Sequence, residues 1–308
     1  MADSLLPLAC FGKLPFWREY LTGGAVHPTS RALRDWLHRG KEALGLENGE
    51  EGVKDEVFNA QLRVLIGLPG SKELLAGVIR PSNDAGGRHF PFTVFTHIPR
   101  KVFGKQYSLL PMALVPVWEA LEDAWDALAA VASREAYEEM LASNSVPGLV
   151  SVAEAKGDYQ GRLGEDAKHL FESDPASSPR ALIERMPEVL IALRKSGGVG
   201  GAHLQFPAVP DLEEACFNAS LWIDLVNRQF RLRRFEPSVL LDARVSAAQR
   251  RVFLKFGPPE PDDYLDVMGA DAKTKLVRPA RSPGPESAPA PDAIDGMSYA
   301  RLLETRFG

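Results

Sequence analysis

The chain has few cysteines and no long apolar run, and both shortages narrow what it can be. Only Cys10 and Cys216 occur among 308 residues, each inside an apolar run. This disfavours a secreted, disulfide-stabilised scaffold and favours the reducing cytoplasm. No apolar run approaches the roughly 20 residues of a membrane-spanning helix, so we expect no direct membrane insertion. No basic segment precedes residues 5–11, so they do not form a signal peptide.

The sequence also lacks common motifs of catalysis and metal binding. The six histidines show neither H-x-H nor H-E-x-x-H spacing, and no cysteine pair supports them. There is no G-x-S-x-G motif, and the glycine-rich residues 197–201 lack the Lys-Ser/Thr of a phosphate-binding loop. The residues therefore predict no cofactor and no metal site.

Excess basic charge is missing as well. The formal net charge is −5, which disfavours nucleic acid as a partner. Hydrophobic residues make up 45% and charged residues 25% of the chain, which is ordinary for a globular protein. The length allows one large domain or two small ones, with a sizeable core.

The apolar patterns predict an α+β fold with a mainly antiparallel central sheet flanked by helices. Helical spacing predicts helices over residues 29–44 (capped by Thr29), 116–140, 179–195 and 258–268. Runs of β-forming residues predict strands over 5–11, 71–79, 90–98, 203–206, 215–225, 229–234, 238–241 and 252–256. Pro7 makes the first an edge strand, and Asn227 and Arg228 turn a hairpin. Residues 57–68 are ambiguous and fit a helical face.

We expect a single domain over residues 1–268, with a polar insertion at about 142–178 that holds a short helical piece near 167–171. Residues 269–308 follow as a flexible tail. Residues 282–292 are rich in Pro, Ser and Ala and cannot bury a core, so we expect them to be disordered. Residues 297–307 regain apolar residues at helical spacing and form a candidate docking helix.

The segment between the strands at 71–79 and 90–98 has the composition of a structured hairpin loop. Pro81 ends the first strand, and Ser82, Asn83 and Asp84 favour turns. Gly87 tolerates a positive φ. Asp84 and Arg88 carry opposite charges, and we expect them to clamp the loop.

Three interpretations of this loop remain open from the residues alone. The loop frames a binding surface or supports the nearby Gly-Lys-Leu-Pro bend. Alternatively, Asp84, Arg88 and His89 are the active-site residues of an enzyme, which requires a concave pocket around them. In the third interpretation, the Gly-rich loops sense a small anion or a nucleotide. A further candidate contact surface is aromatic, with Trp17 beside Phe16 and Tyr20.

Two motifs resemble the TagF (ImpM) family, accessory proteins of bacterial type VI secretion systems. The first is Gly-Lys-Leu-Pro, here Gly12, Lys13, Leu14 and Pro15, followed by Tyr20 and the helix that carries Trp36. The second is Pro-Ser-x-Asp-x-x-Gly-Arg-x-(Phe/Tyr)-Pro, here complete as Pro81, Ser82, Asp84, Gly87, Arg88, Phe90 and Pro91. Leu221-Trp222 more weakly resembles a C-terminal strand of the family.

The resemblance implies a non-enzymatic, post-translational regulator, usually a repressor of secretion-system assembly. Such proteins act in the cytoplasm by binding a forkhead-associated-domain scaffold protein of the same system. The candidate partner-binding or motif residues are Gly12, Lys13, Leu14, Pro15, Trp17, Ser82, Asp84, Gly87 and Arg88. The chain departs from the family at Arg18 and Glu19, where members usually carry Gly and Asp, so a contact made there is expected to differ.

Overall fold

The computed structural model describes residues 5–43, 61–104, 106–165, 203–209, 211–230, 236–243, 250–255, 257–268, 298 and 300. The predicted helix at 179–195, the helical piece at 167–171 and most of the predicted tail lie outside these residues. Among the described residues, no helix combines the length and the apolar character that a bilayer crossing requires.

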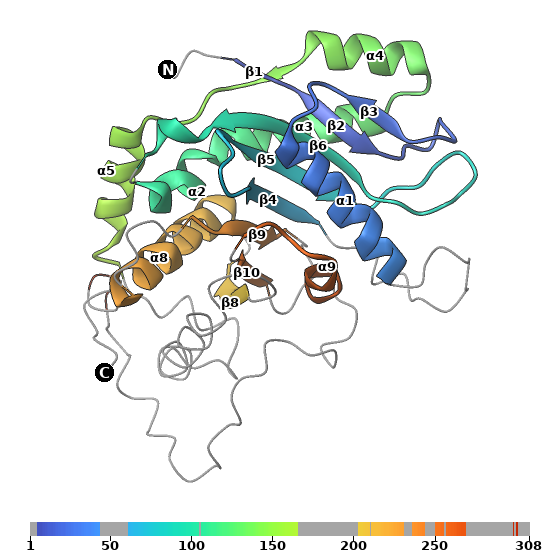
Figure 1. Cartoon of the computed structure of the whole chain (residues 1–308). Coiled ribbons are helices and arrows are strands. Elements are labelled where there is room, and N and C mark those ends of the chain that lie inside the picture. Colours follow the sequence, from blue (N-terminus) through green and yellow to red (C-terminus); the bar gives the residue numbers. More distant parts are fainter. Residues whose placement is uncertain are drawn as a thin grey trace.

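The fold is organised around an eight-stranded sheet with the strand order β3-β2-β6-β5-β4-β9-β10-β8 (Figure 1). All pairings between neighbouring strands are antiparallel. The strands are β2 Ala9–Gly12, β3 Leu21–Gly23, β4 Leu62–Gly67, β5 Glu73–Arg80, β6 Phe92–Pro99, β8 His203–Ala208, β9 Ser238–Asp242 and β10 Arg250–Lys255. β1 Leu6–Pro7 and β7 Ser145–Val146 form a separate two-stranded sheet. The predicted α+β class is confirmed.

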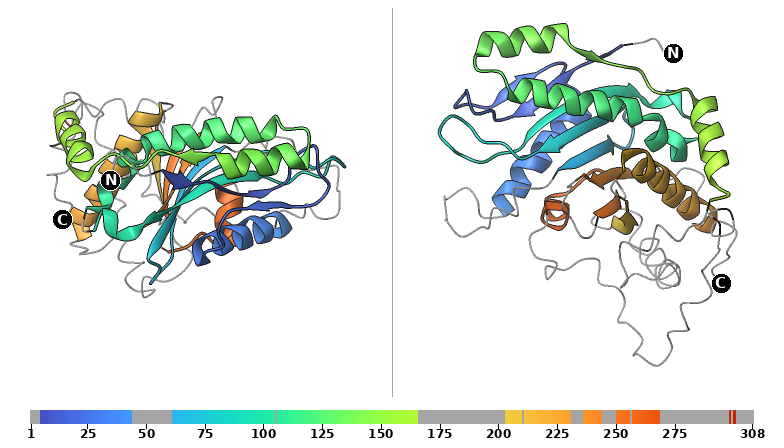
Figure 2. Two further views of the ribbon diagram at one scale, coloured as in Figure 1. Left: turned by 90° about the horizontal axis from the view of Figure 1, so that it is seen from above. Right: turned by 180° about the vertical axis from the view of Figure 1, so that it is seen from behind.

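Helices cover both faces of the large sheet, as the view from above shows (Figure 2). The helices are α1 Pro28–Ala43, α2 Leu110–Ala113, α3 Val115–Ala129, α4 Arg134–Ser143, α5 Val152–Arg162, α8 Leu212–Phe230 and α9 Pro261–Met268, with short 3₁₀ turns η3 Arg100–Val102 and η4 Tyr107–Leu109. Helices α1 and α9 pack on one face, and α3 and α8 pack on the other. Side chains on β5 alternate between the two cores: Leu74, Ala76 and Val78 face α3, whereas Leu75 and Ile79 face α1.

Burial on both faces explains one wrong expectation. Residues 57–68 fit a helical face, but β4 occupies Leu62–Gly67 between β5 and β9. Leu62, Val64 and Ile66 face one core while Leu65 faces the other. A strand buried on both sides reads as a continuous apolar run, which periodicity alone does not distinguish from a buried helix.

The same ambiguity misplaced the C-terminal elements. The strand predicted over 215–225 and the turn at Asn227 and Arg228 are wrong, because both lie in α8. The strand resemblance of Leu221-Trp222 is wrong for the same reason. Part of the strand predicted at 229–234 lies in α8 and the rest lies outside the described residues. The helix-start signal was Asp211, whose carboxylate accepts a hydrogen bond from the Glu214 amide at 2.9 Å.

Capping residues correct two further predictions. The helix predicted over 116–140 is divided: α3 ends at Ala129, and Ser133 caps α4 by accepting from Ala136 N at 3.2 Å. Thr29 does not cap α1, because its hydroxyl is buried without a hydrogen-bond partner. Ser30 Oγ instead accepts a hydrogen bond from His27 N at 3.0 Å.

The first strand and the insertion also differ from expectation. Residues 5–11 were expected to form one edge strand, but Pro7 lies in β1 and the long sheet continues through β2. β2 is internal, between β3 and β6. The described part of the expected insertion contains β7 and the unpredicted helix α5, which Ser151 caps through Glu154 N at 3.2 Å.

A close approach of two helices gives a test of this packing. An added Cβ at Gly40 in α1 would lie 2.1 Å from Tyr264 Cγ in α9, and the Tyr264 side chain is fully buried. We expect Gly40→Ala to lower the free energy of unfolding by about 1–3 kcal/mol, although alanine is the better helix former.

Chemical denaturation of Gly40→Ala and of Arg39→Ala, an exposed neighbour in the same helix, provides the measurement. Arg39→Ala should change stability by no more than about 0.5 kcal/mol. Equal stability of Gly40→Ala and the wild type would contradict the packing of α9 on α1.

Candidate functional site

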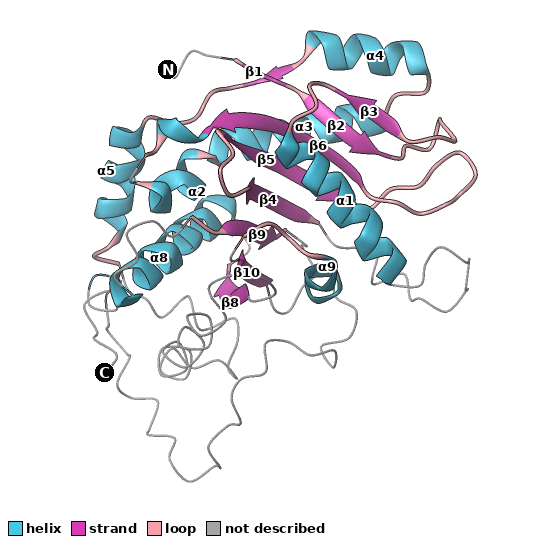
Figure 3. Ribbon diagram, viewed as in Figure 1, coloured by secondary structure: helices cyan, strands magenta, loops and turns pink. Residues whose placement is uncertain are grey.

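Two loops lie side by side at one end of the sheet, coloured pink at the right of Figure 3. The first, residues 13–20 between β2 and β3, is called the Lys13 bend. The second, residues 81–91 between β5 and β6, is called the Asp84 loop. β2 pairs with β6 in antiparallel register, with Phe11 opposite Thr93. The exit of β2 therefore lies beside the entrance of β6, and the two sequence motifs become spatial neighbours.

The Asp84 carboxylate is the centre of the Asp84 loop, and its side chain is fully buried. Oδ1 accepts hydrogen bonds from the amides of Gly86 and Arg88 at 2.8 and 2.9 Å. Oδ2 accepts from Arg88 Nε at 2.7 Å and from Lys13 Nζ at 2.6 Å. The predicted clamp between Asp84 and Arg88 is therefore present, and Lys13 of the other loop completes it.

Lys13 is the contact that the sequence prediction missed. Its side chain is 5% exposed, and its ammonium lies 4.9 Å from the centre of the Tyr20 ring as well as on Asp84. Burial alone would raise the pKa of Asp84, but the hydrogen bonds from Lys13, the Arg88 and Gly86 amides and the Arg88 side chain outweigh it. They hold the pKa of Asp84 well below its usual range, so this carboxylate stays ionised.

Further hydrogen bonds join the two loops along their backbones. Ala85 N donates to Trp17 O at 3.1 Å, and an Arg88 guanidinium nitrogen donates to Arg18 O at 2.8 Å. Within the Asp84 loop, Phe90 N donates to Ser82 O at 3.0 Å. Arg18 therefore contributes its carbonyl, which any residue could supply, while its side chain is exposed.

The remaining motif residues shape the backbone. Gly12 has φ +137°, and an added Cβ would lie 2.2 Å from Pro91 O, so only glycine lets β2 approach the end of the Asp84 loop. Gly87 has φ +78° with open space around it, and its amide donates to Asp84 O at 2.9 Å. Leu14 is fully buried and its carbonyl accepts from Trp17 N at 3.1 Å, whereas Pro15 is exposed.

A hollow of about 480 Å³ opens beside the Lys13 bend, between β3 and α4. Trp17 and Tyr20 line it from the bend, and Arg134, Tyr137 and Glu138 line it from α4. Arg134 lies over the Trp17 ring, 5.1 Å from its centre, which is within cation–π range. The Tyr20 ring is 39% exposed and stacks on Phe11 at 5.6 Å, so its position is fixed from beneath.

The expected aromatic surface is therefore present in part. Trp17 and Phe16 are half-buried, with Phe16 packed against the Tyr137 ring at 6.2 Å, and Tyr20 is the most exposed of the three. Such a hollow presents fixed aromatic edges, an arginine and a carboxylate to a binding partner, a combination typical of protein–protein contact surfaces.

The same geometry gives little support to acid–base chemistry at Asp84. Both of its oxygens are occupied by four donors, and its depressed pKa disfavours proton uptake. His89 is exposed and its backbone forms a bridge with Asn83. Neither Asp84, Arg88 nor His89 lines the hollow beside the bend. Among the described residues, no group of His, Cys, Asp and Glu side chains has the arrangement of a metal site.

These features define an α+β protein that holds an aromatic-lined bend rigidly beside its sheet. Residues 9–143 match the family model described as TagF N-terminal domain, Type VI secretion system-associated. This part of the chain belongs to the TagF family, as its motifs predicted, and the protein is type VI secretion system-associated. The match contains both loops and ends with α4.

One similar solved structure is the crystal structure of PA0076 from Pseudomonas aeruginosa PAO1. It shares 17% sequence identity with this chain over 88% of this chain and 97% of the other, with a TM-score of 0.47. Comparison with curated proteins found no match.

The buried pair of Lys13 and Asp84 predicts a large difference between two substitutions. Asp84→Asn removes one partner and turns an amide donor toward Lys13, so we expect it to lower the free energy of unfolding by about 3–5 kcal/mol. Arg88→Met removes a partner that is 61% exposed and should lower it by no more than about 1 kcal/mol.

Urea unfolding of both variants, and of the double variant Lys13→Met/Asp84→Asn, measures these differences. The double variant should lose less than the sum of its single variants, because neither charge is then buried alone. A loss below about 1 kcal/mol in Asp84→Asn would contradict the role given to this pair.

The pKa of Asp84 also predicts a pH dependence. Because the folded pKa lies below the unfolded value of about 3.9, the stabilisation is complete above that value and is lost as the pH falls toward the folded pKa. Urea unfolding between pH 7 and pH 3 should show a constant difference between wild type and Asp84→Asn down to about pH 5, and a shrinking difference below about pH 4. A difference that grows in acid would show that the sign is wrong.

Proposed function

We propose that this protein is a non-enzymatic, post-translational regulator of type VI secretion system assembly, and specifically a repressor. It acts in the cytoplasm by binding a forkhead-associated-domain scaffold protein of the same system. The family match supports the system, and the resemblance of the two motifs supports the type of partner. The structural support is the hollow beside the Lys13 bend, where a buried ion pair fixes the residues that reach the surface.

The rigidity of the bend favours a binding role. A partner that docks on Trp17 and Tyr20 meets side chains already ordered by Arg134 and Phe11. Less conformational entropy is then lost on association, which raises affinity without adding contacts. In this proposal the Asp84 loop supports the bend from behind, and the partner does not contact the Asp84 carboxylate.

The alternative functions have less support. An enzyme that uses Asp84, Arg88 and His89 needs a group able to exchange a proton, and Asp84 is held ionised by its donors. An anion sensor needs an available cation, but Arg88 already binds Asp84 and the Arg18 carbonyl. The glycine-rich residues 197–201 lie outside the described residues. Calorimetry with phosphate and with nucleotides tests the sensor alternative directly, and heat of binding to either would favour it.

The proposal predicts that the indole of Trp17 is required for partner binding. Calorimetric titration of the purified chain with the forkhead-associated-domain protein of the same bacterium should give at least about 30-fold weaker binding for Trp17→Ala, the size typical of a central aromatic contact. Trp125→Ala provides the matched control, because Arg80 covers the half-buried Trp125 ring at 5.2 Å but Trp125 does not line the hollow.

Circular dichroism should show that both variants remain folded. In cells, deletion of the protein should raise secretion, and Trp17→Ala should fail to restore repression. Equal affinity of Trp17→Ala and wild type would eliminate the hollow as the contact. Failure to capture any secretion-system protein, together with unchanged secretion on deletion, would overturn the proposed function.

A further inference from the structure

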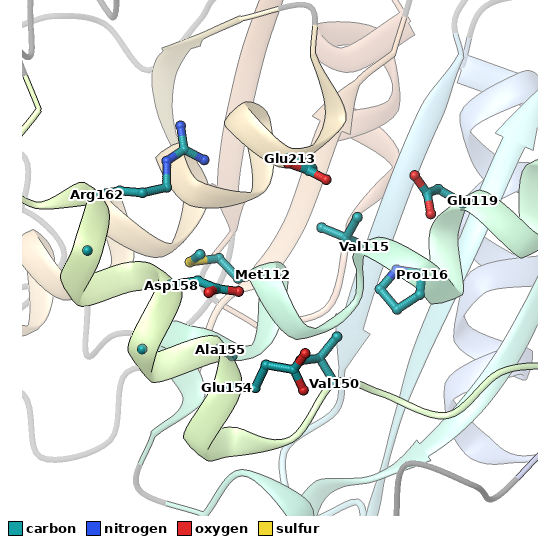
Figure 4. Close-up of a pocket in the computed structure, with 12 residues that line it drawn as sticks. Met112, Val115, Pro116, Glu119, Val150, Glu154, Ala155, Asp158, Arg162 and Glu213 are labelled. Carbon is teal, nitrogen blue, oxygen red and sulfur yellow. The ribbon is translucent and has the colours of Figure 1, made fainter.

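A second hollow, of about 590 Å³, lies away from the two loops, among α2, α3, α5 and the start of α8 (Figure 4). We call it the α5 groove. Its apolar wall is formed by side chains of α2, α3, the segment before α5 and α5 itself: Met112, Val115, Pro116, Val150 and Ala155. The groove lies mostly beyond residue 143, where the family match ends, so the family assigns it nothing.

Acidic side chains dominate the charge of the groove. Four exposed carboxylates line it: Glu119, Glu154, Asp158 and Glu213. Among the described residues none of the four has an ion-pair partner. The basic residue that lines the groove, Arg162, is already paired with Glu214 and with Glu165. The groove therefore suits an occupant that is apolar on one side and carries positive charge.

Helix α5 turns an unusually bare face to this groove. Gly157 and Gly161 are one helical turn apart and both line it. A Cβ added to either glycine would meet no described atom within 4 Å, so the space above them is open. Glycines at this spacing let a second helix approach closely.

The C-terminal part of the chain reaches one end of the α5 groove. Ala300 N donates a hydrogen bond to Leu163 O at 2.8 Å, immediately after Arg162, the last residue of α5. The residues that follow are Arg301, Leu302, Leu303, Glu304, Thr305, Arg306, Phe307 and Gly308. They combine two arginines with three large apolar side chains, which is the chemistry that complements the groove.

The lengths also agree. As a helix, residues 301–308 extend about 12 Å, because each residue advances the helix by about 1.5 Å. The stretch of α5 from Glu154 to Arg162 has the same length by the same rule. A segment that starts at Leu163 and runs back along α5 would bring residue 307 level with Gly157, and Arg306 near Glu154.

We propose that the α5 groove is the intramolecular docking site of the chain's own C-terminal segment, residues 301–308. The apolar side chains Leu302, Leu303 and Phe307 pack on the glycine face and the apolar wall, and the two arginines pair with the carboxylates. The segment thereby closes a surface that a partner helix of similar chemistry can enter only by displacing it. This proposal does not depend on the secretion-system function.

Disulfide trapping in the full-length chain tests the proposal. The pair Gly157→Cys and Phe307→Cys should form an intramolecular disulfide under mild oxidation, and the native cysteines do not interfere because both are buried. The matched control pairs Phe307→Cys with Lys156→Cys, an exposed neighbour on α5 that does not line the groove. We expect trapping at Gly157→Cys to be about tenfold faster than at Lys156→Cys, since a disulfide requires Cα atoms within about 7 Å.

Charge reversal makes the test specific. Arg301→Glu with Arg306→Glu should slow trapping about tenfold at low salt, and Glu154→Arg with Asp158→Arg should restore it. Equal rates at Gly157→Cys and Lys156→Cys would overturn the proposal. Disulfide-linked dimers would overturn it too, because they would place the segment on a second copy of the chain.

Hydrogen exchange provides a readout without engineered cysteines. In the full chain, Phe307→Asp should increase exchange of the α5 amides about tenfold over wild type, because the segment no longer covers them. Thr305→Asp provides the control: it adds the same charge but alters none of the three apolar side chains, and it should change exchange much less. Unchanged α5 exchange in Phe307→Asp would contradict the docking site.

Discussion

The ion pair between Lys13 and Asp84 is the interaction on which the candidate site depends. It joins two loops whose sequence positions are 71 residues apart, and it does so with both side chains almost wholly removed from water. Burying two charges is unfavourable unless every remaining hydrogen-bonding position is satisfied. The Asp84 carboxylate meets this condition with two backbone amides and the Arg88 side chain. A pair of this kind is sensitive to small displacements, so it fixes the separation of the two loops.

The sheet determines where this pair lies. Because β2 is inserted between β3 and β6, the Lys13 bend is supported by a strand on either side as well as by the Asp84 loop. Gly12 makes the close approach to Pro91 possible, and the Phe11 ring supports Tyr20 from the face that α1 covers. The position of the aromatic side chains at the surface therefore follows from the core, and not from local flexibility of the bend.

The sequence predicted the hairpin, its loop chemistry and the family, because each has a local signature. Pro81, the turn-forming residues after it and the charges of Asp84 and Arg88 are neighbours in the chain. Lys13 was missed as the partner of Asp84 because this contact depends on the pairing of β2 with β6. β4 and α8 were misassigned because each is buried on nearly all sides, and a continuous apolar run does not specify its period. The caps at Ser133 and Asp211 would have corrected the boundaries of α4 and α8.

The two hollows differ in how their walls are held, and this difference bears on their roles. The hollow beside the Lys13 bend has aromatic side chains fixed by a buried ion pair and by the cation–π contact of Arg134, so its shape exists before any partner arrives. The α5 groove has bare glycines, and its carboxylates have no ion-pair partner in the described part of the chain, so its wall is complete only when something apolar and basic covers it. A preformed surface gives affinity with little ordering, whereas an incomplete one couples binding to the docking of a segment. In one chain the first arrangement suits constant recognition, and the second suits control of access.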